Sequence, residues 1–270
     1  MFDAQEWKLQ DKFYHENHDI VESFDRRIIR KYELERKYFT LYKWIEIFKG
    51  IKAQKVLDFG CATGTVSLAL ARNGIKAFAL DASSAMIDQV KKKAQAESLA
   101  VTYIIGDAEQ LPIESNCFDG VICLGVLHHL PNITKGLEEQ IRVLKTGGMI
   151  FISEPFKHRA WISYPYHFCI EAIRRVIKLF KSDNLSTRER LLTYAHINEM
   201  RAVLDQHHLD YQIKYFVYWP NVVGFLPEFI GYPLVCSLNK INQGSNRGDI
   251  VIISITKNTN KDTTLDKISS

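Results

Sequence analysis

The chain has 270 residues, of which 46% are apolar and 24% charged, and its formal net charge is +4. This composition is that of an ordinary soluble protein, and the chain is long enough to bury a full core. The small net charge gives no reason to expect a nucleic-acid partner. Five cysteines without a CxxC pair favour reduced thiols, and the charged first residues lack a secretory signal, so we expect a cytoplasmic protein.

Residues 1–50 are predicted to be helical, because apolar residues recur there at three- to four-residue intervals between charges. From residue 55 onwards, strands and helices alternate. Strands are predicted at 55–59, 76–81, 101–105, 118–124, 149–154, 210–218 and 249–256, with helices at about 65–72, 83–97, 133–144 and 196–207. The alternation predicts a doubly wound, Rossmann-like α/β fold with a mostly parallel seven-stranded sheet. Ligands of such sheets lie at the carboxyl ends of the strands.

Two segments depart from this alternation. Residues 156–193 are aromatic and basic and include a predicted amphipathic helix, whereas residues 215–236 are very apolar. Three prolines and Glu228 interrupt the second segment, so we do not expect it to span a membrane. The predicted domains are an N-terminal helical segment (1–50), a core domain (51–257) with insertions at 156–193 and 219–247 that would form a cap, and a polar tail (258–270).

A glycine-containing turn joins the first predicted strand to the first helix of the core domain, in the sequence DFGCATG at 58–64. Such a turn lets the backbone approach a ligand closely. A phosphate-binding P-loop needs Gly-Lys-Ser/Thr, which is absent. The dinucleotide pattern GxGxxG is met only at Gly60, since Ala62 and Thr65 occupy the other two positions. The turn alone leaves the ligand class open, and a nicotinamide dinucleotide is one alternative.

Four segments in order narrow the choice: DFGCATG, ALD, GDAEQLPIESNCFDGVICLGVLHHL and LKTGGMIFISEP. Together they resemble the class I S-adenosylmethionine-dependent methyltransferases, and most closely the domain typified by ubiquinone/menaquinone-biosynthesis (type 11) methyltransferases. The resemblance covers about residues 50–155. It implies S-adenosyl-L-methionine as the cofactor and methyl transfer by in-line displacement as the activity.

The resemblance also implies a cofactor-binding role for individual residues. The first turn would lie beside the amino-acid moiety, the acid ending the second strand would take the ribose hydroxyls, the GDA segment would read the adenine, and the end of the fourth strand would contact the methionine portion. These roles fall on Asp58, Gly60, Ala62, Gly64, Asp81, Asp107, Ala108, Leu124 and Gly125. Taken singly, Asp81 and Asp107 are also what a helix cap or a turn requires.

A general base is needed only if the acceptor loses a proton on methylation. His128 and His129 follow the fourth predicted strand directly and are the candidate catalytic residues; alternatively they begin a helix and one ring packs or caps there. His158, His167 and His196 are further candidates. No metal site is predicted, because the run HENH at 15–18 lacks a third ligand.

The acceptor is the part of the function that the motifs leave open. The basic and apolar segments fit a lipid-like acceptor reached at a membrane surface, or a hydrophobic lid over the active site with solvated lysines outside. We expect a small-molecule or lipid-like acceptor, methylated at oxygen or carbon, and no nucleic-acid partner. An RNA methyltransferase and a non-catalytic cofactor-binding module are the alternatives. The oligomeric state stays open.

Overall fold

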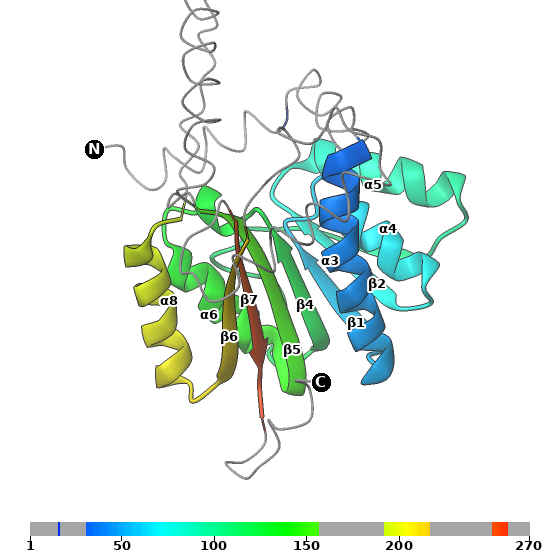
Figure 1. Ribbon diagram of the computed structural model, residues 1–270. Helices are drawn as coiled ribbons and strands as arrows, with labels where there is room; N and C mark the ends of the chain where they lie inside the picture. Colours follow the sequence, from blue (N-terminus) through cyan, green and yellow to red (C-terminus); the bar gives the residue numbers. More distant parts are fainter. Residues whose placement is uncertain (1–15, 17–30, 157–191, 217–249, 259–270) are drawn as a thin grey trace, which may run out of the picture.

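The computed structural model describes residues 16, 31–156, 192–216 and 250–258 (Figure 1). The described residues form a seven-stranded sheet in the order β3-β2-β1-β4-β5-β7-β6, in which only β7 runs antiparallel to its neighbours β5 and β6. The strands are β1 (Lys55–Phe59), β2 (Lys76–Asp81), β3 (Val101–Ile105), β4 (Phe118–Leu124), β5 (Leu144–Pro155), β6 (Asp210–Phe216) and β7 (Ile250–Thr256). The predicted doubly wound α/β fold is therefore confirmed.

Helices begin where the sequence supplies a capping side chain. The Ser83 hydroxyl accepts a hydrogen bond from the Met86 amide, and the Asn132 side chain accepts one from the Lys135 amide at 3.0 Å. These contacts satisfy amides that have no partner within a helix. The helices are α3 (Lys31–Gly50), α4 (Thr65–Arg72), α5 (Ser84–Ala96), α6 (Ile133–Val143) and α8 (Tyr194–Gln206), with a short 3₁₀ helix η1 (Leu127–His129) before α6.

One face of the sheet is covered by α3, α4 and α5. Trp44 of α3 stacks on Phe151 of β5 with ring centroids 5.0 Å apart, and both side chains are buried. Phe48 of the same helix lies so close to Gly120 that a Cβ atom there would be 2.1 Å from its ring. A glycine within a buried strand is thus explained by the close approach of α3.

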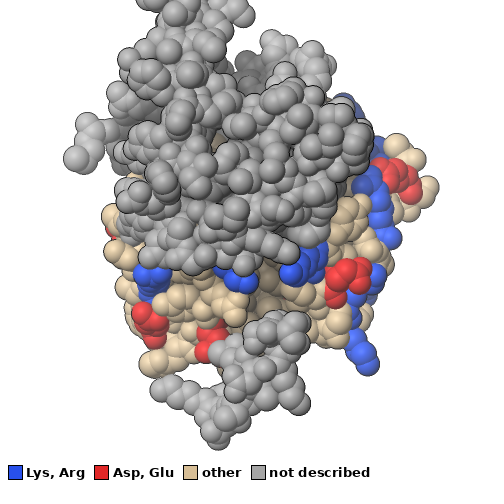
Figure 2. All heavy atoms as spheres, viewed as in Figure 1, with Lys and Arg blue, Asp and Glu red and all other residues tan. Residues whose placement is uncertain are grey.

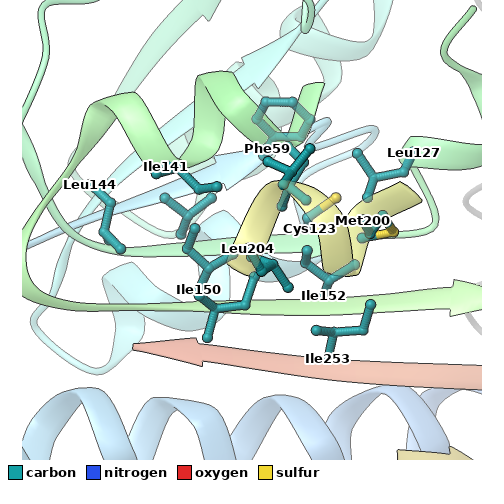
Figure 3. Close-up of a cluster of buried hydrophobic side chains, with 14 of the residues drawn as sticks. Phe59, Cys123, Leu127, Ile141, Leu144, Ile150, Ile152, Met200, Leu204 and Ile253 are labelled. Carbon is teal, nitrogen blue, oxygen red and sulfur yellow. The ribbon is translucent and has the colours of Figure 1, made fainter. Parts of the chain in front are cut away.

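The opposite face is covered by α6 and α8 (Figure 3). Ile150 and Ile152 of β5 pack there with Leu204 and Met200 of α8, and all four side chains are fully buried. The sheet thus has apolar layers on both faces, as a doubly wound sheet requires. What the two layers leave open is the edge where the strands end.

The fifth strand differs from its prediction. It begins at Leu144 rather than 149, because Leu144 already pairs with Phe118 before the register shifts. Gly147 and Gly148 lie within this irregular strand, and Gly147 has φ +82. Their backbone exchanges hydrogen bonds with Lys257, just after β7.

The two insertions leave and return at one edge of the sheet. Phe156 and Leu192 form a bridge directly after β5, so the ends of the first insertion meet there. Ile250 pairs with both Pro155 and Phe216, which places the ends of the second insertion beside the first. This is the edge at which the parallel strands end. The predicted amphipathic helix and apolar segment, and most of residues 1–30 and of the tail, lie outside the described residues.

Candidate functional site

The turn after β1 has a left-handed backbone at three positions: Gly60 (φ 73), Ala62 (φ 45) and Gly64 (φ 90). A Cβ atom at Gly60 would lie 2.4 Å from Val126, and one at Gly64 would lie 2.8 Å from Val90. Both glycines are therefore required by backbone conformation and by packing. Ala62 holds a conformation that costs a non-glycine residue about 1–2 kcal/mol.

The carboxylate of Asp81, which ends β2, accepts hydrogen bonds from the loop after β1 and from the loop after β2. One carboxylate oxygen accepts the Ala62 amide and the other accepts the Ser83 amide, each at 2.9 Å. The first contact holds Ala62 in its left-handed conformation, and the second fixes the start of α5. The two oxygens of a carboxylate have about four acceptor positions, and the hydroxyls of a ligand are suitable donors for such positions.

Asp58 is 2% exposed and turns away from solvent toward α4. One of its oxygens accepts the Ser67 amide at 2.9 Å and the Ser67 hydroxyl at 2.5 Å. Burial raises the pKa of this carboxyl to about 7, although the Ser67 bonds act in the opposite direction; the nearby charge of Asp81 adds to the rise. Asp58 is thus a buried group whose charge changes near neutral pH.

The third and fourth strands bring the remaining predicted residues to the same edge. The Gly106 amide donates to the carbonyl of Asp81, so the ends of β2 and β3 are joined. Asp107 is exposed and accepts the Glu109 amide at 2.9 Å, while its neighbour Ala108 packs partly against the core. This edge of the sheet therefore carries the carboxylates of Asp81 and Asp107, and that of Asp107 accepts a hydrogen bond within a turn.

At the end of β4, Leu124 is partly buried and packs against the core on the α3 face. Gly125 (φ 66) donates its amide to the carbonyl of Ser153 at 2.8 Å, which joins the ends of β4 and β5. Among the described residues, a Cβ atom at Gly125 would meet His128 alone, at 3.7 Å. The described residues therefore leave more room in front of Gly125 than in front of Gly60.

This donor and acceptor set fits S-adenosylmethionine. Gly125 leaves room beside the backbone, the Asp81 carboxylate suits a pair of hydroxyls, and Asp107 suits an amino group on a heteroaromatic ring. Asp58 suits an ammonium group through its charge, and its raised pKa makes that contact depend on pH.

A buried glutamate that the sequence analysis did not single out organises the other half of the edge. Glu154 of β5 is 1% exposed, and one of its oxygens accepts the Val126 and Leu127 amides at 2.8 and 2.9 Å. Its other oxygen lies 2.7 Å from Nδ1 of His128. An acid at the end of an apolar strand, the signal that marked Asp81, also marks Glu154.

His128 and His129 lie together on η1, with ring centroids 4.1 Å apart. Leu127–His129 form a short 3₁₀ helix, and the Val126 and Leu127 amides at its start donate to Glu154. With an ionised Glu154 and a neutral His128 ring, Nδ1 would donate to the carboxylate and Nε2 would carry the lone pair of a base.

A pocket of about 380 Å³ opens beside this pair. It lies between the start of α6 and the start of α8, and residues of both helices line it. The lining residues are His128, Leu130, Pro131, Asn132, Ile133, Thr134, Leu192, His196 and Glu199. Of the other histidines considered from the sequence, His196 reaches this pocket, whereas His158 and His167 lie outside the described residues.

Metal binding and thiol chemistry find no support in the part of the chain that the structure describes. No group of three or more potential metal ligands occurs there. Burial, together with the charges of Asp58 and Asp81, raises the pKa of the Cys61 thiol, and burial with the charge of Glu154 raises that of Cys123. Both cysteines are free and keep their protons, which makes them poor nucleophiles.

On the part of the described surface that is visible in Figure 2, Lys and Arg lie among Asp and Glu. Bound nucleic acid requires clustered basic side chains. Separately, none of the helices within the described ranges has the length and apolar character needed to cross a bilayer.

Residues 57–152 match a family model described as "Methyltransferase domain". A Coxiella burnetii protein named "Ubiquinone biosynthesis O-methyltransferase" is 33% identical over 111 residues, which are 41% of this chain and 47% of that protein. The chain thus spans about half the length of the curated relatives it matches first.

Solved structures share the fold across more of the chain. A protein from Methanococcus maripaludis, described as dependent on S-adenosyl-L-methionine and as a methyltransferase, has a TM-score of 0.53 at 21% identity and is covered to 96%, with 98% of this chain. The cyclase SpnF has a TM-score of 0.51 at 20% identity, over 77% of this chain and 75% of its own. The fold is thus shared by proteins described as catalysing different reactions.

Proposed function

We propose that the chain is an S-adenosylmethionine-dependent methyltransferase through the domain at residues 57–152, and that it transfers a methyl group from that cofactor to a hydroxyl group of a small, lipid-like molecule. The observation that carries the proposal is the buried His128–Glu154 pair, 2.7 Å apart, beside both the cofactor edge and an open pocket. A binding module without chemistry has no need of such a pair.

In this proposal Asp81 and Asp107 hold the nucleoside, and Asp58 with the Gly60–Gly64 turn takes the amino-acid end. S-adenosylmethionine, held by these residues, would supply an electrophilic methyl group and would leave as S-adenosylhomocysteine. The protein aligns the acceptor and excludes water, which supplies several kcal/mol of the barrier reduction in such reactions. Gly125 and Leu124 would line the reacting portion.

His128 would accept the proton that the acceptor hydroxyl loses. The carboxylate of Glu154 keeps the other ring nitrogen protonated and stabilises the imidazolium that forms. After product release, the proton passes from Nε2 to solvent and the base is restored. Proton transfer of this kind contributes about 10²–10⁴-fold to a rate.

The pocket offers both apolar and polar surface to an acceptor. Leu130, Pro131, Ile133 and Leu192 form its apolar walls, and its polar lining residues are His128, Asn132, Thr134, His196 and Glu199. The relative named for ubiquinone biosynthesis is an O-methyltransferase, which agrees with transfer to oxygen. We therefore favour O-methylation over C-methylation and over an RNA acceptor.

We assign residues 51–257 to the catalytic domain, residues 1–50 to a helical segment and residues 258–270 to a tail. The insertions at 156–193 and 219–247 begin and end at the carboxyl edge, so a cap over the acceptor is the role we assign them. Alternatively, the basic insertion at 156–193 contacts a membrane surface. In that case the protein should bind anionic vesicles, and added salt should reverse this binding.

The test is transfer of isotope-labelled methyl from S-adenosylmethionine to a panel of hydroxylated aromatic and prenylated compounds, with S-adenosylhomocysteine as the second product. We expect label on oxygen for at least one apolar hydroxyl compound, and loss of transfer in His128→Ala with cofactor binding intact. Binding of the cofactor without transfer to any acceptor or to a cell extract would instead support the cofactor-binding module.

A further inference from the structure

One turn of the chain carries a residue of the cofactor edge and also bonds to the wall of the pocket. Residues 107–110 form this turn. The Asp107 carboxylate accepts the Glu109 amide at 2.9 Å, and the Asp107 carbonyl accepts the Gln110 amide at 3.1 Å. The carboxylate of Glu109 in turn accepts the backbone amide of Asn132 at 2.7 Å. Glu109 thus joins the turn to a segment 23 positions further along the chain.

That segment is the wall of the pocket at residues 130–134. Asn132 is the N-cap of α6, and its side chain accepts the Lys135 amide at 3.0 Å and the Thr134 hydroxyl at 2.7 Å. A carboxylate is favourable beside the first amides of a helix, because these amides lack partners within the helix and carry partial positive charge. The bond from Glu109 therefore fixes the point at which the wall continues into the helix.

The far half of the same loop is held to α6 independently of Glu109. Glu139 accepts the Leu111 amide at 2.6 Å, and Arg142 donates to the Ile113 carbonyl at 2.7 Å. Glu139 and Arg142 also bond to each other, at 2.7 Å. These four residues are not among those that line the pocket. The loop after β3 is thus attached to α6 at two places, and the attachment through Glu109 is the one at the pocket.

We propose that Glu109 is a positioning residue that couples the cofactor edge to the pocket, so that a cofactor bound at Asp107 orders the wall at residues 130–134. The inference rests on the proposed function, which places the nucleoside at Asp107 and the acceptor in the pocket. A bound nucleoside restricts the turn that Asp107 begins, so Glu109 loses less freedom when it bonds to Asn132. Ordering that is shared in this way makes two binding events favour each other without a change of fold.

The response is measured by hydrogen exchange of the Asn132 amide, followed by NMR in the full chain with and without saturating S-adenosylhomocysteine. Both residues of this bond lie near the surface, Asn132 exposed and Glu109 half-buried, so the amide should exchange when the bond opens locally. We expect the ligand to slow this exchange by at least about fivefold, the lower end of the usual coupling between two sites.

Two substitutions at Glu109 separate its contact from the fold. Glu109→Gln keeps a side-chain oxygen that can accept the Asn132 amide, whereas Glu109→Ala removes it. We expect the slowing to persist in the Gln variant and to fall below about twofold in the Ala variant. Because coupling is reciprocal, the Ala variant should lose S-adenosylhomocysteine affinity by no more than the factor by which the wild-type exchange slows. Persistence of the slowing in Glu109→Ala would overturn the proposal.

Glu139→Ala is the matched control, because it removes another carboxylate that accepts a backbone amide between this loop and α6. It should lower the free energy of unfolding and leave the slowing at Asn132 in place. Loss of the slowing in Glu139→Ala to the same extent as in Glu109→Ala would overturn the proposal, because the response would then follow stability in general.

The wild-type chain separates this inference from the proposed function. Binding of S-adenosylhomocysteine without slower exchange at Asn132 would overturn the coupling through Glu109 and leave the proposed function in place. No binding of S-adenosylhomocysteine would overturn the proposed function, and the coupling with it.

Discussion

The carboxyl edge of the sheet consists of two halves that are built differently. On the β1–β2–β3 half, the carboxylates of Asp81 and Asp107 bond to backbone amides of the adjoining loops. On the β4–β5 half, a carboxylate bonds to an imidazole, and a second imidazole is held by the cap of a helix. The boundary lies between β1 and β4, where the strand order reverses.

The difference separates the two tasks that we assign to the site. Carboxylates bonded to backbone hold loops in a shape that serves the common part of a cofactor. A histidine ring that is fixed by a bond at one nitrogen can offer its other nitrogen to a ligand. Such directional contacts are what recognition of a particular acceptor requires. Variants in the first half should therefore change cofactor affinity and stability, and variants in the second half should change turnover.

The largest expected effect is in the second half. His128→Ala should lower kcat by about 10²–10⁴-fold, because the proton acceptor is lost, while S-adenosylhomocysteine affinity stays within about twofold. The matched control is His129→Ala, which removes the adjoining ring that does not bond to Glu154. Steady-state kinetics and titration of both variants check this. A greater loss of turnover in His129→Ala than in His128→Ala would contradict the assignment of His128 as the base.

The next effect is in the first half. Asp81→Ala should weaken S-adenosylhomocysteine binding by about 2–3 kcal/mol, or roughly 30–150-fold, because two hydroxyl acceptors are lost. It should also lower the free energy of unfolding by about 1–3 kcal/mol, since the Ala62 and Ser83 amides lose their acceptor. Calorimetric titration and chemical denaturation measure the two effects separately.

Asp119 provides the control for Asp81. It accepts the Gln54 and Lys55 amides, each at 2.8 Å, but at the amino-terminal edge of the sheet. Although burial acts to raise it, bonds from Lys145 and from these two amides hold the pKa of Asp119 below its usual range. Asp119→Ala should therefore lose stability without losing cofactor affinity. Equal losses of affinity in the two variants would show that Asp81 acts only through the fold.

A smaller effect concerns pH and Asp58. Because burial raises the pKa of Asp58 from 3.8 to about 7, the free protein should lose stability as pH rises from about 4 through 7. A cationic ammonium group favours the ionised form, so S-adenosylmethionine should bind best above pH 7, with affinity falling up to about tenfold per pH unit below it. Titration calorimetry in buffers of different ionisation enthalpy should detect proton release at pH 6. Asp58→Asn is the control variant, and it should abolish the pH dependence of the affinity. An affinity that does not change with pH, without proton release, would show that Asp58 does not contact the ammonium group.

The smallest effect tests the turn itself. Ala62→Gly relieves a left-handed conformation but adds freedom to the unfolded chain, so stability should change by less than about 1 kcal/mol. Gly64→Ala should lose at least about 2 kcal/mol, because its Cβ atom would lie 2.8 Å from Val90 as well as at φ 90. Thermal and chemical denaturation compare the two. Similar losses in both variants would contradict the packing account of the turn.

The sequence predicted the first half of the site better than the second. Caps and turns such as Ser83 and Asn73-Gly74 are local signals, and α4 and α5 lie where those signals placed them. The strand ends that carry Asp81 and Asp107 follow directly from the alternation of strands and helices. Their proposed ligand contacts came from the resemblance to the family, and they stay predictions.

The second half depends on contacts between residues far apart in the chain. Glu154 reaches His128 across 26 positions, and this pairing follows from the register that sets Leu124 beside Ser153. Neither periodicity nor composition reports that register. The bond from the Thr193 amide to Nδ1 of His196, at 3.2 Å, likewise forms only once α8 begins at Tyr194, two residues earlier than predicted.

The central claim is tested most directly by calorimetric titration of the full chain with S-adenosylhomocysteine and, separately, with NAD, in the wild type, Asp81→Ala and His128→Ala. We predict micromolar binding of S-adenosylhomocysteine to the wild type, about −8 kcal/mol, and none of NAD. Asp81→Ala should lose this affinity, and His128→Ala should retain it. Binding of NAD instead, or equal loss of S-adenosylhomocysteine affinity in the two variants, would contradict the division of the site into a cofactor half and an acceptor half.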